Sequence, residues 1–500
     1  MKAQPGKQVS EHQSSYSMLV VGPVRPVSRP AGILLGIAFL SWYVMDSMSF
    51  NPSVGLVFSF FVASLFFAYR ASLGILPSMR LLLLAGPGIA ACFVYWLTDG
   101  TMFVTYYAGE WLTPIFVREF AMASAVAGLA SVVGHMAGAR SMPAPFNLRL
   151  YTTGRSEVKA VSWMGLAVAV LMLLDQAYRV GDYLHHTGSY GKTVQIAPPP
   201  PLLGIWNSVG MYLILVSFLG LHYRDGRMRR PRVIWVVLVL SVIMNMMLRG
   251  LRQDTFPVLG IIIFFSWLLI RPQPPARPVL YAILIVSAGY VVGVFTGRLR
   301  TTFSWAGFQN LLDSPLAMFF FKNYTGGTSF LLETASSVAG TFLVVFLKTS
   351  GGTVGLLYGR SYLDFIPRTP PEFLYPGRPQ DLAWEMKYEG VWLASGGILE
   401  ISEAYWNFSR LGILLVPLLI SYFVTRVSLK VCDCSNPMFA AFPLAIMATM
   451  SRWILYQTFA LYKGTVAIAV FSLIVWITVK ILVGGARPNS FPPHTEPVQR

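Results

Sequence analysis

Long apolar stretches separated by short polar connections make up most of the chain. The stretches at 202–221 and 464–483 are continuous apolar blocks, without alternation of apolar and polar positions. The hydrocarbon core of a bilayer is about 30 Å thick, so a spanning helix needs about 17–25 mostly apolar residues. Strands of a membrane barrel would instead show short alternating stretches. The pattern therefore predicts membrane helices, whose backbones satisfy their own hydrogen bonds in lipid.

About twelve segments, whose bounds are set to within a few residues, have the apolar character and approximate length of a transmembrane helix. They are 31–45, 53–69, 81–97, 113–137, 160–178, 202–221, 233–248, 256–270, 278–297, 411–427, 437–451 and 464–483. The sequence thus predicts an all-α polytopic membrane protein. We divide it into an N-terminal tail (1–30), a nine-helix region (31–297), a large loop region (298–410), a three-helix region (411–483) and a C-terminal tail (484–500).

Hydropathy leaves one segment, 329–347, open. It contains Glu333 and several Thr, Ser and Gly residues, which make it a poor span. If it does not cross and the N-terminus is inside, the whole net charge of +17 lies on the cytoplasmic side, as the positive-inside rule requires. We therefore predict a protein of the bacterial inner membrane with cytoplasmic termini and a periplasmic, partly helical loop at 298–410. Whether 329–347 re-enters the membrane stays open.

Composition narrows the possible functions. Hydrophobic residues make up 55% of the chain and charged residues only 12%, about half the charge of a soluble domain. Orientation and attraction to anionic membrane lipids explain the basic character, so no nucleic-acid partner is predicted. The sequence contains neither a phosphate-binding loop nor an HExxH motif. Two of its three cysteines, Cys432 and Cys434, form a CxC pair, which alone is a weak metal signal. We predict no cofactor and no metal site.

Arginines on the predicted periplasmic side are candidate anion ligands. Each offers a planar fork of donors that can hold a phosphate with two hydrogen bonds. The candidates for binding a pyrophosphate are Arg249, Arg252, Arg298, Arg300, Arg360, Arg368 and Arg378. Alternatively, these side chains pair with periplasmic carboxylates or extend to lipid headgroups.

The region 351–410 is rich in Gly, Pro and aromatic residues, which suits an ordered, irregular loop over a cavity. Such long structured loops usually carry function. Aromatic rings there could stack on sugars, and they would equally suit the aromatic belt at the membrane surface. The candidates for binding a glycan are Tyr362, Tyr375, Trp384 and Tyr405.

Several short motifs in this region resemble the Wzy-type polymerases of bacterial surface polysaccharides such as O-antigens. They are Gly359-Arg-Ser-Tyr362, Ile366-Pro-Arg368, Pro376-Gly-Arg-Pro379 and Glu403-Ala-Tyr-Trp-Asn-Phe408, followed by Leu411-Gly412. The resemblance is strongest over roughly 351–412. It implies a GT-C-like membrane glycosyltransferase that works on oligosaccharide repeat units linked to a polyprenyl (undecaprenyl) pyrophosphate. It also implies inverting, metal-independent transfer at the periplasmic face and a chain-length-regulating co-polymerase as a partner.

Such a transfer needs a base for the acceptor hydroxyl. Glu403 is the favoured candidate, because Glu400 and Glu403 are three residues apart and would share one helical face. Asp254 and His186 are reserve candidates. Alternatively, Glu403 forms a structural ion pair with Arg410 or another arginine.

Two other functions stay open. An O-antigen ligase would share the donor, but it would be expected to carry a prominent histidine in the large loop, and 298–410 contains none. A lipid-linked oligosaccharide transporter would be expected to carry charges within its spans and inverted repeats. Few charges lie in the middle of the predicted spans, and no repeated half is recognisable.

Overall fold

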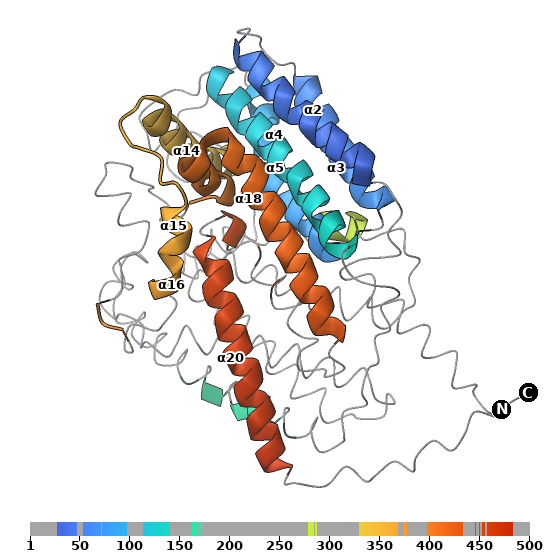
Figure 1. Ribbon diagram of the computed structural model, residues 1–500, viewed down its shortest axis with the longest axis vertical. Coiled ribbons are helices and arrows are strands. Elements are labelled where there is room, and N and C mark those ends of the chain that lie inside the picture. Colours follow the sequence, from blue (N-terminus) through green and yellow to red (C-terminus); the bar gives the residue numbers. More distant parts are fainter. Residues whose placement is uncertain are drawn as a thin grey trace, which may run out of the picture.

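The computed structural model describes residues 28–47, 54–71, 73–97, 114–140, 330–368, 375–377, 398–433 and 458–483, with isolated residues in 160–174, 279–287 and 446–455. These residues are almost entirely helical and include no β-strand. The helices are α2 (Ser28–Ser47), α3 (Val54–Arg70), α4 (Ile75–Leu97), α5 (Pro114–Arg140), α14 (Phe330–Ser350), α15 (Arg360–Leu363), α16 (Phe365–Arg368), α18 (Glu400–Asp433) and α20 (Phe459–Leu482) (Figure 1).

Three of the described helices are long and apolar enough to cross a membrane: Ile75–Cys92 in α4, Ile115–Arg140 in α5 and Glu400–Lys430 in α18. α2, α3 and α20 contain shorter apolar stretches. The predicted membrane helices at 31–45, 53–69, 81–97, 113–137, 411–427 and 464–483 are therefore confirmed as helices. The predicted spans between 160 and 297 and at 437–451 lie largely outside the described residues, as do the tails 1–27 and 484–500.

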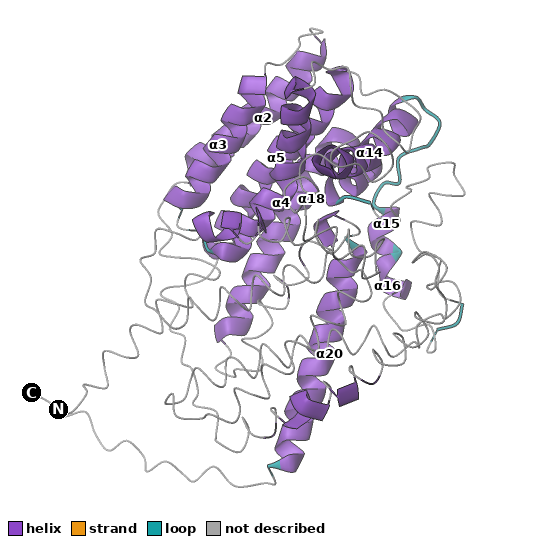
Figure 2. Cartoon of the chain, turned by 180° about the vertical axis from the view of Figure 1, so that it is seen from behind, coloured by secondary structure: helices purple, strands orange, loops and turns teal. Residues whose placement is uncertain are grey.

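Helix α5 is the centre of the described bundle. α2, α3 and α4 lie side by side with it, as both views show (Figures 1 and 2). Small residues let α4 approach closely, because Gly88 meets Ser124 of α5 and Gly128 meets Ala85 of α4. The later residue of α4, Gly88, thus contacts the earlier residue of α5, and the earlier residue of α4, Ala85, contacts the later one. The two helices are therefore antiparallel. Close backbone approach through small residues is the usual way that helices associate in lipid.

Helices α5 and α18 pack in parallel along much of their length. Glu119 contacts Arg410, Ser131 contacts Ser421 and His135 contacts Thr425, a nearly constant offset in residue number. If both helices cross the bilayer in the same direction, the chain between them crosses an odd number of times. The five spans predicted there, with 329–347 not crossing, satisfy this condition.

The tightest part of the α5–α18 contact depends on Gly134. A Cβ atom at this position would collide with the carbonyl group of Leu418. We expect Gly134→Ala to destabilise the protein by about 1–3 kcal/mol, because a rigid backbone must move to make room. Thermal unfolding of the purified protein in detergent measures the effect. Gly86→Ala on α4 is the matched control, since nothing lies within 4 Å of the place that its new methyl group would take; equal midpoints for the two variants would contradict the expectation.

Helix α18 is broken near its start. Phe408 and Ser409 have non-helical backbone angles, and Ser409 has a positive φ of 54°. The segment before the break folds back on the segment after it. The carbonyl group of Ala404 lies so close to Gly412 that a Cβ atom at this position would collide with it. The predicted span at 411–427 thus begins directly after the break. The residues 400–407 form a separate short helical segment in front of it.

The segment 329–347, predicted to be a poor span, is helical: α14 covers Phe330–Ser350, although it is not among the three candidate membrane helices. Phe342 packs against Phe116 and Phe120 of α5, with ring centroids 6.2 and 5.3 Å away. It also contacts Tyr405 in the short segment before the break. α14 therefore joins the start of α5 to the segment 400–407.

Candidate functional site

Buried charged residues of the described chain gather in two clusters on either side of the break in α18. We call them the Glu403 cluster (Arg80, Ser361, Glu400, Glu403 and Asn407) and the Glu119 cluster (Trp42, Arg118, Glu119 and Arg410). Charges at this depth are costly and usually functional when they lie inside a membrane protein. Each cluster therefore needs a physical explanation.

Arg80 and Glu400 form a fully buried ion pair. Both guanidinium Nη atoms donate to the Glu400 carboxylate, at 2.9 and 2.5 Å, and both side chains are 0% exposed. The Nε atom of Arg80 donates to the hydroxyl of Ser421 at 2.7 Å, and that hydroxyl donates to Ser131. The guanidinium also lies 4.7 Å from the ring centroid of Trp453. Arg80 of α4 thus connects Glu400 to Ser421, which lies in α18 after the break.

Glu403 lies one turn further along the same segment and has different partners. Its Oε1 atom accepts a hydrogen bond from the hydroxyl of Ser361 at 2.8 Å. Asn407 donates both to that hydroxyl and to the backbone carbonyl of Glu403, and its Oδ1 atom accepts from the amide of Gly359. No basic side chain in the described part of the chain forms an ion pair with Glu403. It is therefore a buried carboxylate held by neutral donors.

The loop 355–361 caps the end of the segment 400–407. The last carbonyl groups of a helix lack partners within the helix. Here the amides of Leu357 and Tyr358 donate to the carbonyls of Trp406 and Asn407, both at 3.0 Å. Gly359 adopts a φ of 89°, and the ring of Phe408 lies 3.1 Å from where a Cβ atom would be. Only glycine fits this turn without strain, which explains its place before Arg360.

Tyr362 and Thr458 lie next to the Glu403 carboxylate. The ring of Tyr362 stacks on Phe408, and burial together with the charges of Glu403 and Glu400 raises the pKa of the Tyr362 hydroxyl well above its usual value. The Tyr362 hydroxyl thus keeps its proton and can donate a hydrogen bond. Thr458 approaches the same carboxylate, yet neither its hydroxyl nor Oε2 of Glu403 has a hydrogen bond of normal geometry within the described residues. The Thr458 hydroxyl and Oε2 of Glu403 could therefore bind a further polar group.

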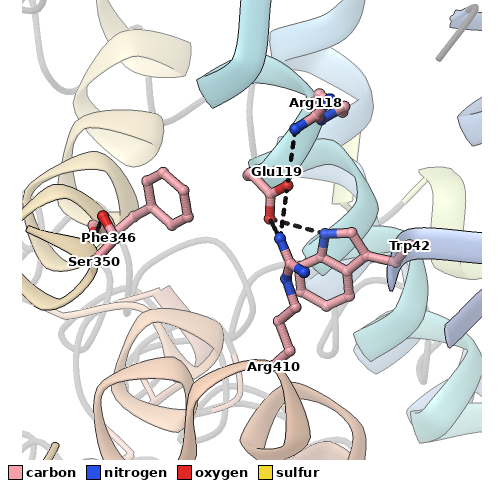
Figure 3. Close-up of polar contacts among 6 residues, drawn as sticks. All are labelled: Trp42, Arg118, Glu119, Phe346, Ser350 and Arg410. Carbon is pink, nitrogen blue, oxygen red and sulfur yellow. Dashed lines mark hydrogen bonds and ion pairs between the residues drawn. The ribbon is translucent and has the colours of Figure 1, made fainter. Parts of the chain in front are cut away.

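The Glu119 cluster joins α2, α5 and the segment after the break (Figure 3). Arg410 donates to both oxygens of Glu119 at 3.1 Å, and the indole Nε1 of Trp42 donates to Oε2 at 2.8 Å. Arg118 lies 3.5 Å from Oε1. The guanidinium of Arg410 also rests on the rings of Trp42 and Tyr43. The suggested pairing of Glu403 with Arg410 is therefore wrong, because Glu119 occupies that arginine.

The structure places only some of the predicted site residues. Arg360 is exposed and lies 3.8 Å from Asp364, and Tyr375 is 43% exposed. Arg368 is the last residue of α16. Tyr405 is 6% exposed and packs on Phe342 and Phe346, so little of its ring is open to a glycan. The remaining predicted residues lie outside the described part of the chain: Arg249, Arg252, Arg298, Arg300, Arg378, Asp254, His186 and Trp384.

Sequence reasoning missed Arg80 and Glu119 as members of buried clusters. The apolar pattern places Arg80 just outside a span beginning at 81, whereas α4 begins at Ile75 and encloses it. Glu119 and His135 both lie inside the predicted span 113–137, and charged or titratable residues within a span are themselves a signal of function. His135 contacts Thr425 across the α5–α18 interface.

No group of three or more His, Cys, Asp or Glu side chains in the described ranges is placed to hold a metal ion. Comparison with protein-family models, curated proteins and solved structures finds no match to this chain.

Proposed function

We propose that this chain polymerises polyprenyl-pyrophosphate-linked oligosaccharide repeat units at the periplasmic face of a bacterial inner membrane, as a glycosyltransferase of GT-C type. One observation carries the proposal. The motif residues 359–362 and 403–408, which lie more than forty residues apart and carry the resemblance to Wzy-type polymerases, form one hydrogen-bonded unit through Gly359, Ser361, Glu403 and Asn407. A motif pair that meets around a buried carboxylate favours a catalytic role.

In the proposed reaction, a hydroxyl oxygen of the incoming repeat unit attacks the anomeric carbon of the growing chain. The bond from that carbon to the pyrophosphate oxygen breaks, and the polyprenyl pyrophosphate leaves with the electron pair. Glu403 takes the hydroxyl proton, a role that suits a carboxylate held by neutral donors. Arginines, including Arg360 and Arg368 of the adjoining short helices, would stabilise the departing pyrophosphate.

Transport of a lipid-linked oligosaccharide is the second candidate. The broken helix α18 and the buried ion pairs Arg80–Glu400 and Glu119–Arg410 favour it. Discontinuous helices and intramembrane charges are common in transporters. The ligase alternative shares the donor with the polymerase, and no contact in the described residues favours it over polymerisation.

Deleting the gene in the source bacterium distinguishes the three functions. If the chain is the polymerase, the surface glycan should shorten to single repeat units, and a plasmid copy should restore the ladder of chain lengths on a gel. Loss of a ligase would leave long glycan on its lipid carrier. Loss of a transporter would leave single repeat units on the cytoplasmic face, protected from glycosidases added to spheroplasts. A normal ladder in the deletion strain would contradict the polymerase proposal.

A further inference from the structure

The two carboxylates of the segment 400–407 have different kinds of partner, one charged and one neutral. Glu400 and Glu403 lie on the same helical face, and both side chains are 0% exposed. Glu400 receives both arms of the Arg80 guanidinium, whereas Glu403 receives the hydroxyl of Ser361. In the described chain, the buried cation of Arg80 therefore pairs with Glu400 and forms no ion pair with Glu403, the neighbouring buried carboxylate.

Three contacts retain Arg80 on the side of Glu400. The two-armed ion pair has the geometry that guanidinium and carboxylate groups favour. The bond to Ser421 orients the third nitrogen, and Trp453 covers the face of the guanidinium. An arginine freed from Glu400 would keep a buried charge without a partner, which is costly. The next carboxylate on the same face is Glu403.

We propose that Glu400 is a positioning residue that retains Arg80 and thereby keeps this cation away from Glu403. An arginine paired with Glu403 would make that carboxylate a weaker proton acceptor. The catalytic consequence rests on the proposed function, in which Glu403 is the base. The distribution of charge between the two glutamates does not depend on it and can be measured separately.

An apolar carbodiimide, dicyclohexylcarbodiimide, reports this distribution directly. A protonated carboxyl transfers its proton to one nitrogen of the reagent and its oxygen bonds to the central carbon. The adduct then rearranges to a stable N-acylurea, which peptide mass spectrometry locates. A buried carboxyl held by neutral donors carries a proton more readily than one paired with arginine. In the wild-type protein in detergent, we expect modification of Glu403 and not of Glu400.

Three variants test the role of Glu400. In Glu400→Gln, modification of Glu403 should fall by about tenfold or more, because the freed Arg80 favours its unreactive carboxylate form. Chain growth should fall with it. The double variant Arg80→Gln with Glu400→Gln removes the cation and should restore both readings toward wild type. Ser402→Ala, which removes a buried hydroxyl that has no hydrogen-bond partner among the described residues, is the matched control and should leave the modification of Glu403 unchanged.

If the Arg80–Glu400 ion pair is only structural, Glu400→Gln should change the modification of Glu403 in the opposite direction. Loosening the segment in Glu400→Gln would expose Glu403 and increase its modification, and an equal or greater modification in folded protein overturns the proposal. If Glu400→Gln does not yield folded protein, Arg80→Gln decides, because Glu400 should then become modified as well as Glu403. An unmodified Glu400 in that variant also overturns it. If the wild-type protein is modified at Glu403 and not at Glu400 but does not extend chains, the charge distribution is supported and the proposed function is overturned.

Discussion

Glu403→Gln is expected to slow chain growth by about 100- to 10,000-fold, the usual contribution of a positioned general base. Glutamine keeps the size of the side chain and can still accept the hydrogen bond from Ser361, but it cannot take a proton. Lipid-linked single repeats should therefore bind as before. The measurement is the rate at which polymer appears when purified protein in proteoliposomes receives lipid-linked repeat units, with binding measured on the same preparation.

The neighbouring Ser402 provides a matched control for this prediction. It is buried in the same turn, and its hydroxyl has no hydrogen-bond partner among the described residues. Ser402→Ala should therefore leave both binding and chain growth close to wild type. Normal chain growth by Glu403→Gln would show that another group is the base, and Asp254 would be tested next. The proposed polymerase function would survive that result.

Apolar runs predicted the helices of the described chain well, because burial in lipid depends on length and hydropathy. They could not predict the segment 400–407. Its residues include Glu400 and Glu403, so hydropathy assigns it to a loop. Burial of the two glutamates depends on partners from distant positions, Arg80 and Ser361. Neither Phe408 nor Ser409, the two residues of the break, is a glycine or proline. The nearest glycine is Gly412, where the chain passes close to the carbonyl group of Ala404.

The site was predictable where its signal is local. The spacing of Glu400 and Glu403 correctly indicated one helical face, and the motif 359–362 marked the loop that meets it. Partners far apart in sequence could not be assigned. Arg80 lies 320 residues before Glu400, and nothing in either neighbourhood selects the other. The pairing of Arg410 with Glu119, 291 residues away, was missed for the same reason.

Glu119→Ala is expected to have the largest effect on stability. Glu119 is 1% exposed and accepts from Arg410 and Trp42, with Arg118 also close by. Its removal takes away the carboxylate that pairs with Arg410 and lies 3.5 Å from Arg118. Breaking a buried ion pair typically costs about 3–5 kcal/mol, much of it from the charge left behind.

The amount of folded protein in membranes and its unfolding midpoint in detergent measure this cost. Arg410→Ala should be milder than Glu119→Ala, because Arg118 still lies 3.5 Å from Glu119 and offsets its charge. Arg426→Ala is the matched control on the same helix, since Arg426 is exposed and bonds only Tyr422 among the contacts described. It should change stability by no more than about 0.5 kcal/mol. If Glu119→Ala unfolds at the wild-type midpoint, the Glu119 cluster does not hold α2, α5 and α18 together. If the variant unfolds at a lower temperature but its folded fraction extends chains normally, the cluster stabilises the fold without taking part in the chemistry.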